Sequence, residues 1–347
     1  SEMCIRDRGM YGFKLDSSPA DSNSGLLPSR GHDPQRSVDQ YAKLGLTGKV
    51  RYSKTVLKYG AMLPDMPLLK YNDGRLLPTM FHGAALTSEE SSDLRLSLMR
   101  LDQYTARDST DAQDIRVHCK NKRYACDTTA DHFDSAGVDY RFNDRLSAQY
   151  QVAKLENIYR QHFLGLVASQ PLRAGKLAAD LRLIKSDDIG RARAGEIDHR
   201  AFSGMLGYSL GGHKVSAGWQ RMFGDSAMPY LDGSNPYLVN YAQVNDFAAA
   251  RERSWQLRYD YDFKAMGVDG LSFFTRYIGG DHIQVPGSLA EGKEWERDSE
   301  LKYQVQGGTF KDLSLRLRNS TYRSNYEKFA RDMDETRLIV SYNLSIW

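Results

Sequence analysis

The stretch RLIVSYNLSIW, residues 337–347, alternates strictly between two kinds of side chain. One face carries only apolar or aromatic residues, and these are Leu338, Val340, Tyr342, Leu344 and Ile346. The other face is mostly polar, with Arg337, Ile339, Ser341, Asn343 and Ser345. A period of two residues is typical of a β-strand with one face in an apolar environment. We therefore predict that this segment is a strand.

The same alternation recurs from one end of the chain to the other, whereas helical periodicity is nearly absent. The segments that show it are 42–52, 177–183, 255–263, 271–277, 301–305 and 313–318. Many run to ten residues or more, which is longer than a usual sandwich strand of about 5–6 residues. The pattern predicts an all-β fold with about fifteen strands.

Short and long connections separate these strands. Asn143-Asp144 and Gly211-Gly212 are good tight-turn dipeptides. Roughly 61–92, 103–132 and 224–251 are long and irregular. This combination is typical of an antiparallel transmembrane β-barrel with short periplasmic turns and longer external loops. A large soluble β-sandwich or propeller is the alternative.

Length and composition exclude several classes. The 347 residues contain no apolar run near the roughly 20 that a membrane helix needs. Barrel strands need only about 9–11 alternating residues, so a membrane barrel stays possible. A net charge of +3 does not argue for a nucleic-acid partner. The chain has no GxSxG, HExxH, phosphate-binding loop or CxxC pair, so we predict neither an enzyme nor a cofactor.

The polar faces of the last strands carry basic residues. An Arg at the lipid-facing midplane costs about 2–4 kcal/mol, so these faces are predicted to line a lumen. Parity then directs five side chains inward: Arg276, Lys302, Arg316, Arg318 and Arg337. Such a column attracts carboxylates strongly enough to recruit them and weakly enough to release them. The alternative is that these residues only pair with lumenal carboxylates.

The segment of about 61–92 is too apolar for a loop in water. It holds Pro64, Pro67 and Pro78, which are incompatible with a regular strand. We predict that it folds into the barrel and narrows the pore, with Arg75 at the constriction. The alternative is an external loop packed against its neighbours.

The spacing of two cysteines suggests a disulfide. Cys119 and Cys126 have the spacing of a small disulfide-closed loop, with two unpaired thiols as the alternative.

Residues 1 to about 9 lack both a signal-peptide core and a strand pattern. We expect this start to be foreign, misread or disordered, with the native start missing and residues 10–347 forming one barrel domain.

Several stretches together resemble the OprD-type outer-membrane porins, substrate-specific channels of Gram-negative bacteria. They are SKTVLKYGAMLP (53–64), GRLLPT (74–79), LENIYRQHFL (155–164), RAGEID (193–198), SWQLRYD (254–260), GVDGLSFFTRYIGGD (267–281), KDLSLRLRN (311–319) and RLIVSYNLSIW (337–347). The resemblance implies an 18-stranded barrel in the outer membrane with a narrow constriction. It implies uptake of small carboxylate-bearing solutes, such as basic amino acids, small peptides or aromatic acids.

The resemblance also implies roles for residues. It assigns the basic row to Arg75, Lys302, Arg316, Arg318 and Arg337, and an acidic pocket to Asp246 in QVNDF (243–247). It implies contact with outer-membrane lipid and lipopolysaccharide, and with the barrel-assembly machinery, which reads a terminal aromatic residue such as Trp347. A monomer or a loose trimer is expected.

The chain departs from the family pattern in two places. The first two strands and part of the third have no counterpart before Met10, which would leave two unpaired strand edges. Val244 stands where basic-amino-acid channels have Tyr, which weakens that specificity. We predict a porin for passive diffusion of carboxylates. The alternative is a soluble or surface β protein that binds an anionic ligand.

Overall fold

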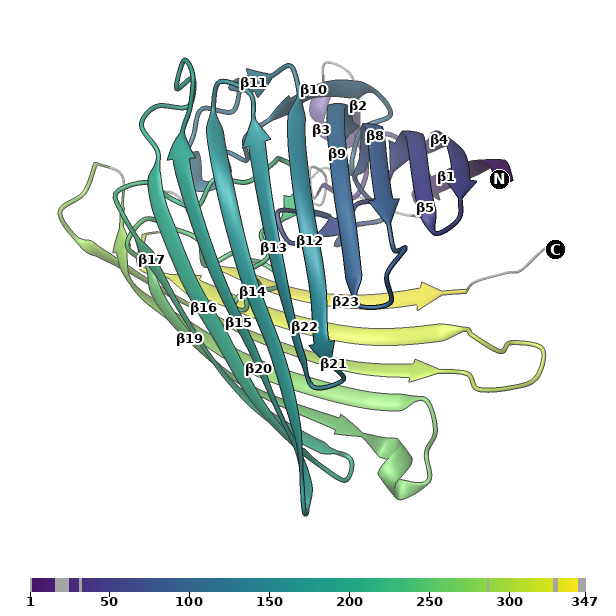
Figure 1. Cartoon of the computed structure of the whole chain (residues 1–347). Helices are drawn as coiled ribbons and strands as arrows, with labels where there is room; N and C mark the ends of the chain where they lie inside the picture. The colour runs from purple at the N-terminus through teal and green to yellow at the C-terminus, as the bar shows by residue number, and fades with distance from the viewer. Residues whose placement is uncertain (1, 16–24, 31–32, 286, 327–329, 343–347) are drawn as a thin grey trace.

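The computed structural model describes residues 2–15, 25–30, 33–285, 287–326 and 330–342. These residues are mostly strands, which curve into a wall around chain segments that lie inside it (Figure 1). The described helices are two short 3-10 turns, η2 (Lys120–Lys122) and η3 (Phe263–Met266). Over the described ranges, no helix is long and apolar enough to cross a membrane.

One 18-stranded sheet dominates the structure. Its strands are β1 (Glu2–Phe13), β4 (Gln40–Tyr52), β5 (Thr55–Met62), β8 (Met80–Ser88), β9 (Leu94–Thr105), β10 (Ala112–Arg116), β11 (Thr129–Ala130), β12 (Phe133–Asn143), β13 (Leu146–Leu155), β14 (Tyr159–Leu172), β15 (Gly175–Asp188), β16 (Asp198–Leu210), β17 (His213–Phe223), β19 (Arg253–Asp262), β20 (Leu271–Gln284), β21 (Glu291–Gln304), β22 (Ser314–Ser324) and β23 (Met333–Ser341). All of their registers are antiparallel, as an up-and-down barrel wall requires.

The registers place the long strands in chain order. They run from β1 through β4, β5, β8, β9 and β12 to β17, and from β19 to β23. The short β10 and β11 attach beside the end of β9. Within the described residues, the registers give β1 the single neighbour β4 and β23 the single neighbour β22. Two strand edges therefore have no partner in that part of the chain.

The chain start, residues 1 to about 9, was expected to be foreign, misread or disordered, with the barrel domain beginning at residue 10. Residues 2–9 instead form part of β1 and pair with β4 from Glu2↔Arg51 to Gly9↔Leu44. A strand edge binds another strand through backbone N–H and C=O groups, which every sequence supplies. Alternating side chains are therefore not needed for this pairing.

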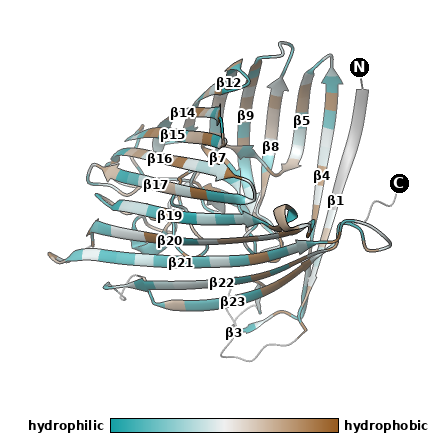
Figure 2. Cartoon of the chain, turned by 90° about the horizontal axis from the view of Figure 1, so that it is seen from below, coloured by the Kyte–Doolittle hydropathy of each residue, from teal (hydrophilic) through white to brown (hydrophobic). Residues whose placement is uncertain are grey.

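The outer face of the wall is apolar, as the alternation predicts. Leu44 is 69% exposed, Leu338 is 73% exposed and Val340 is 60% exposed, whereas Lys43 and Gly45 beside Leu44 are buried. Figure 2 shows hydrophilic and hydrophobic bands alternating along the strands. The predicted tight turns are present as well, because 144–145 and Gly211–Gly212 join adjacent strands. Trp347 and the rest of 343–347 lie outside the described residues.

The two ends of the wall have different connections. One end has only turns and loops of moderate length, such as 53–54, 173–174 and 305–313. The other end carries the long connections 106–132 and 224–252, together with 63–79. Long loops mark the extracellular end of an outer-membrane barrel, and short turns mark the periplasmic end.

The predicted inner segment is shorter than expected. Of residues 61–92, only 63–79 connect β5 to β8, because Met80–Ser88 pairs with both β5 and β9. The apolar Met80 and Phe81 are buried as strand residues and not as loop residues. All three prolines lie outside strands, as predicted. Apolar content alone did not separate the loop from the strand that follows it.

A candidate lumenal constriction

Three long connections lie inside the wall and pack against each other. We call them inner loop 1 (63–79), inner loop 2 (106–132) and inner loop 3 (224–252). The small strands β6 (Asp65–Met66) and β7 (Leu69–Tyr71) of inner loop 1 form a three-stranded sheet with β18 (Ser234–Asn235) of inner loop 3. Inner loops 2 and 3 meet in a bridge between Val117 and Leu231. Inner loop 3 therefore contacts both of the others.

An apolar core joins these loops to one side of the wall. Leu69, Val117 and Leu231 from the three loops are 0% exposed. They belong to one cluster with Phe81, Leu101, Phe133, Leu155 and Phe163, which point inward from β8 to β14. Burying each such side chain stabilises the fold by about 1.5–3 kcal/mol. This side of the wall thus acts as the platform on which the loops are fixed.

The opposite side of the wall holds inner loop 3 with carboxylates. Glu294, Glu296 and Asp298 point inward from β21 and are at most 3% exposed. Glu296 accepts hydrogen bonds of 2.8 Å from the backbone N–H groups of both Val244 and Asn245. Bonds from backbone donors to a carboxylate are charge-assisted and strong. They anchor the loop next to a small apolar contact of Ala242 and Phe247 with Ile278 of β20.

Three arginines gather where inner loop 1 approaches β23. Arg337 Nη1 donates to the Gly74 carbonyl oxygen at 2.8 Å. Arg107, at the start of inner loop 2, donates to Asn72 Oδ1 at 3.2 Å. Arg75 of inner loop 1 is close enough to both Arg337 and Arg107 for their charges to act on it. We call Arg75, Arg107 and Arg337 the constriction cluster.

The constriction cluster has little internal compensation. Arg337 forms an ion pair with Glu335 at 2.7 Å. The buried Nε of Arg75 has no hydrogen-bond partner in the part of the chain that the structure describes. Burial, together with the charges of Arg337 and Arg107, lowers the pKa of Arg75. A guanidinium stays protonated in proteins, so the cluster keeps an unmet demand for negative charge.

Lys43 adds a cation beside the constriction cluster. Its side chain points inward from β4 and is 3% exposed as a residue. Its Nζ donates to the carbonyl oxygens of Pro78 at 3.1 Å and of Ala106. Lys43 therefore ties inner loops 1 and 2 to the wall through neutral acceptors. Its ammonium has no ion pair among the described residues, although the charge of Asp108 acts on it.

The residues of the predicted basic row fall into two groups. We call a residue tied when its side chain pairs with a carboxylate of the wall and holds a loop, and open when it has no ion pair among the described residues. Arg276 forms a 2.6 Å ion pair with Asp298 and also donates to the Tyr241 carbonyl. Arg318 donates to Glu300 at 2.6 Å and to Gln243 at 2.6 Å. These two residues fit the alternative reading, in which lumenal arginines pair with the wall and hold a loop.

Lys302 and Arg316 are the open members. They stand directly opposite each other on β21 and β22, one step toward the periplasmic end from Arg318. Among the described residues, neither side chain has an ion pair, and the buried Arg316 Nε has no acceptor. Like charges that face each other across a strand pair are unfavourable. This arrangement is therefore suited to an anion that comes between them.

Asp246 does not form the open acidic pocket that was expected. It is 1% exposed and accepts hydrogen bonds from Arg123 Nη1 at 2.7 Å and from the Tyr230 hydroxyl at 2.8 Å. Burial opposes its ionisation, but the charges of Arg123 and Lys120 hold the pKa of its carboxyl below the usual range. An internal arginine therefore occupies the position that a substrate cation was expected to take.

The cysteine pair explains how Arg123 reaches Asp246. The structure joins Cys119 and Cys126 in a disulfide, and η2 and Arg123 lie inside the loop that it closes. Arg123 and Asp246 lie 123 residues apart in the chain. The disulfide loop is thus part of the packing inside the lumen.

Sequence reasoning missed several residues of this region. Lys43 could have been found, because the alternation of 42–52 already places it on the polar face. Arg107 and Arg123 lie in an irregular segment, where no periodicity reports direction. The carboxylates of β21 also alternate visibly in EWERDSE (294–300), and their parity signals an inward acidic row.

An apolar outer face, inward-facing charged side chains on β21 to β23 and loops that lie inside the wall are the features of an outer-membrane channel. The chain matches the family model described as outer membrane porin, OprD family, over residues 5–346. The protein belongs to this family, is a porin and is located in the outer membrane. The family's members are channels, not enzymes.

Three relatives illustrate the match. The porin-like protein GalP of Pseudomonas putida is 37% identical, over 97% of this chain and 80% of GalP. The crystal structure of OccK10 (OpdN) from Pseudomonas aeruginosa is 65% identical, with a TM-score of 0.84, over 88% of this chain and 85% of that one. OpdK from Pseudomonas aeruginosa, solved with vanillate, is 40% identical with a TM-score of 0.91, over 98% of this chain and 87% of that one.

Proposed function

We propose that the channel selects small monocarboxylates, including aromatic acids, and conducts them by passive diffusion without chemical conversion. The constriction cluster carries the proposal. Its three guanidinium groups come from three separate segments, and the described structure bonds only Arg337 of them to a carboxylate. A carboxylate that enters is the natural partner for this positive charge, because the Nε of Arg75 has no acceptor among the described residues.

Two steps along the lumen support a path for the anion. The constriction cluster lies at inner loop 1, and the Lys302–Arg316 pair lies nearer the periplasmic end. A unit charge pair at 4 Å is worth about 1 kcal/mol in water and about 4 kcal/mol at an effective dielectric of 20. A wet lumen lies between these limits. Each step then binds the anion without trapping it, which conduction requires.

The state of Asp246 narrows the substrate class. Because Arg123 occupies it, no open carboxylate stands there to receive the positive group of a basic amino acid. Simple acids therefore fit better than basic amino acids. The vanillate in the OpdK structure supports this choice, because vanillate is an aromatic carboxylate.

Planar-bilayer recording of the protein purified from outer membranes tests the proposal. Benzoate should reduce the small-ion current in a saturable way, and arginine at the same concentration should do so much more weakly. Saturation by arginine alone would overturn the proposed class. A current that no carboxylate saturates would overturn the proposed binding at the constriction cluster.

A further inference from the structure

A pocket lies at the extracellular end of the wall, and we call it the mouth pocket. Its volume is about 320 Å³, which is at the low end of the range of small-molecule sites. Its lining comes from inner loop 2, the connection 189–197, both ends of inner loop 3, the end of β20 and Tyr326 after β22. These segments lie where strands end, whereas Arg337 of the constriction cluster lies in the middle of β23. A solute that arrives from outside therefore meets the mouth pocket before the constriction cluster.

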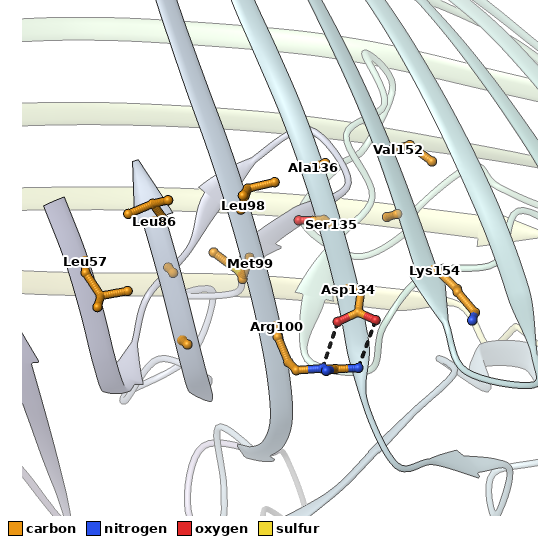
Figure 3. A pocket seen from close by; sticks show the side chains of 13 residues that line it. Leu57, Leu86, Leu98, Met99, Arg100, Asp134, Ser135, Ala136, Val152 and Lys154 are labelled. Atoms are coloured by element: carbon orange, nitrogen blue, oxygen red, sulfur yellow. Dashed lines mark hydrogen bonds and ion pairs between the residues drawn. The ribbon is translucent and has the colours of Figure 1, made fainter. Parts of the chain in front are cut away.

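A hollow on the outer face of the wall has a different character (Figure 3). Its lining is mainly apolar, and its Arg100 forms an ion pair with Asp134 at 2.9 Å. That hollow faces lipid, whereas the mouth pocket borders water, because Glu196 and Asp225 in its lining are exposed. A water-soluble solute therefore reaches the mouth pocket and not the hollow in the outer face.

Two side chains of the mouth pocket have buried N–H groups without an acceptor. These groups are Nη2 of Arg123 and Nδ2 of Asn121, and neither has a hydrogen-bond partner within the described ranges. The Arg123 side chain is only 8% exposed, and its Nη1 already donates to Asp246. A buried donor that lacks an acceptor costs about 1–3 kcal/mol. A ligand oxygen that accepts from these groups recovers that cost.

The disulfide loop positions both donors. Asn121 and Arg123 lie between the two joined cysteines. Lys120 of the same loop donates to the Val244 carbonyl oxygen at 2.9 Å, which fixes the loop to inner loop 3. Donors that are held in place before a ligand arrives lose little conformational entropy on binding.

The charges around the mouth pocket favour a ligand with a single negative group. Lys120 and Arg123 lie beside one carboxylate, Asp246, so these three side chains carry one net positive charge. Glu196 at the rim is exposed and has no ion pair in the part of the chain that is described. One carboxylate at the donors is thus attracted, while a second one near Glu196 is repelled.

The rest of the lining fits an apolar body. Ala249 is one of several small residues in it, and Tyr124 and Tyr326 contribute aromatic rings. The hydroxyls of both tyrosines are already bonded, that of Tyr124 to the Ala227 carbonyl oxygen at 2.6 Å and that of Tyr326 to Glu294. These side chains therefore offer apolar surface and no further open donor.

We propose that the mouth pocket binds a monocarboxylate with an apolar body, such as an aromatic acid, before the solute passes to the constriction cluster. Its carboxylate accepts hydrogen bonds from Arg123 and Asn121, and its ring packs against the small and aromatic side chains of the lining. The mouth pocket thereby concentrates the solute at the entrance. The ligand class rests on the proposed function, but the site is separate from the constriction cluster.

Crystals of the protein soaked with 4-bromobenzoate test the site directly, because bromine gives an anomalous signal. One bromine position is expected in the mouth pocket and another at the constriction cluster. Bromine at the constriction cluster alone would overturn this inference and leave the proposed function intact. Bromine in the mouth pocket alone would support the inference and overturn the proposed binding at the constriction cluster. No bromine at either place would overturn both.

Calorimetric titration of the detergent-solubilised protein with benzoate measures the affinity of the mouth pocket. Arg75→Gln provides the background, because this change is expected to weaken binding at the constriction cluster. Adding Asn121→Asp should weaken the remaining binding about tenfold or more, because a carboxylate then replaces the amide donor. Asp tolerates the left-handed backbone of this position, where φ is 54°, as Asn does. Unchanged binding after Asn121→Asp would overturn the inference.

Asn157→Asp in the same background is the matched control. Asn157 also has a left-handed backbone, with φ of 55°, and it lies at the same end of the wall between β13 and β14, outside the lining of the mouth pocket. Its Oδ1 accepts from the Arg191 backbone N–H at 3.3 Å, and Asp keeps that acceptor. The benzoate affinity should stay unchanged. Equal weakening by both variants would overturn the inference, because binding would then follow the general charge of the extracellular end.

Glu196→Gln tests the selection for a single charge. In the Arg75→Gln background, terephthalate, which has two carboxylates, should bind more weakly than benzoate, and Glu196→Gln should narrow this difference. An unchanged difference would overturn the role of Glu196. The mobility of the unheated protein in gel electrophoresis checks that each variant folds.

Discussion

The two sides of the inner wall share the same alternating strand pattern but differ in the chemistry of their inward side chains. From β8 to β16, inward side chains such as Phe133 and Phe163 form a dry core with the inner loops. From β19 to β23, inward side chains such as Glu296 and Arg316 carry charge. The outer faces of both sides carry exposed apolar side chains, such as Leu98 and Leu301. Lipid thus dictates the outside of a strand, while the inside is free to serve either packing or binding.

The largest expected effect concerns the apolar side. Phe133 is 0% exposed, and Phe133→Ala should leave a cavity beneath the inner loops. Large-to-small changes of buried aromatics cost about 3–5 kcal/mol. Urea unfolding in lipid vesicles should show a loss of this size.

Phe142→Ala is the matched control on the same strand. Phe142 is 57% exposed on the outer face, where lipid can fill the space that the ring leaves. The loss of unfolding free energy in Phe142→Ala should be clearly smaller than in Phe133→Ala. Equal losses for both variants would contradict the view that the apolar inner face is the platform for the loops.

The next effect concerns the charges that hold inner loop 3. Asp246→Asn leaves Arg123 buried without its carboxylate. Removing one partner of a buried ion pair costs about 3–5 kcal/mol, and the remaining amide can recover part of that. We expect noisier open-channel current and faster protease cleavage within 224–252.

Asp225→Asn serves as the control in the same loop. Asp225 pairs with Arg251, but both side chains are largely exposed, and such pairs contribute about 0–1 kcal/mol. Noise and cleavage should stay at the level of the unaltered protein. If Asp225→Asn matches Asp246→Asn, burial is not what makes the inner pair important.

A smaller effect is expected at the constriction cluster. Arg75→Gln removes the guanidinium whose Nε lacks a partner. The apparent affinity for benzoate in bilayer recording should fall about tenfold, which corresponds to about 1.4 kcal/mol. Arg191→Gln, on the exposed connection 189–197, makes the same charge change and should leave the affinity unchanged.

The smallest effect separates open from tied members of the basic row. Lys302→Gln/Arg316→Gln should reduce benzoate flux roughly threefold without loss of stability, because it relieves two facing like charges. Arg318→Gln should instead lower the thermal stability, because it leaves Glu300 and Gln243 without their donor. Identical behaviour of the two variants would mean that the distinction between open and tied arginines has no functional content.

The strands and the direction of their side chains could largely be predicted from local sequence patterns. Alternation around Arg316 and Arg337 gave the correct inward direction, because a strand places successive side chains on opposite faces. It could not tell that Arg318 is tied and Arg316 is open. That difference depends on Gln243, which belongs to inner loop 3 and lies 75 residues away.

The arrangement of the loops inside the wall was predicted less well. One inward segment was expected, but three connections enter the lumen, and one of them brings Arg123 onto Asp246. Irregular segments have no period, so their direction is set by what they pack against. The disulfide loop and inner loop 3 are far apart in the chain, and only the tertiary structure brings them into contact.

By itself, the sequence determined the strands, the orientation of their side chains and the outer-membrane environment, because lipid and water act on each strand locally. Tertiary structure alone decided which cations stay open to a solute, and which carboxylates and loops neutralise the rest. Pairing energies depend on distances between segments far apart in the chain, and no local pattern records those distances.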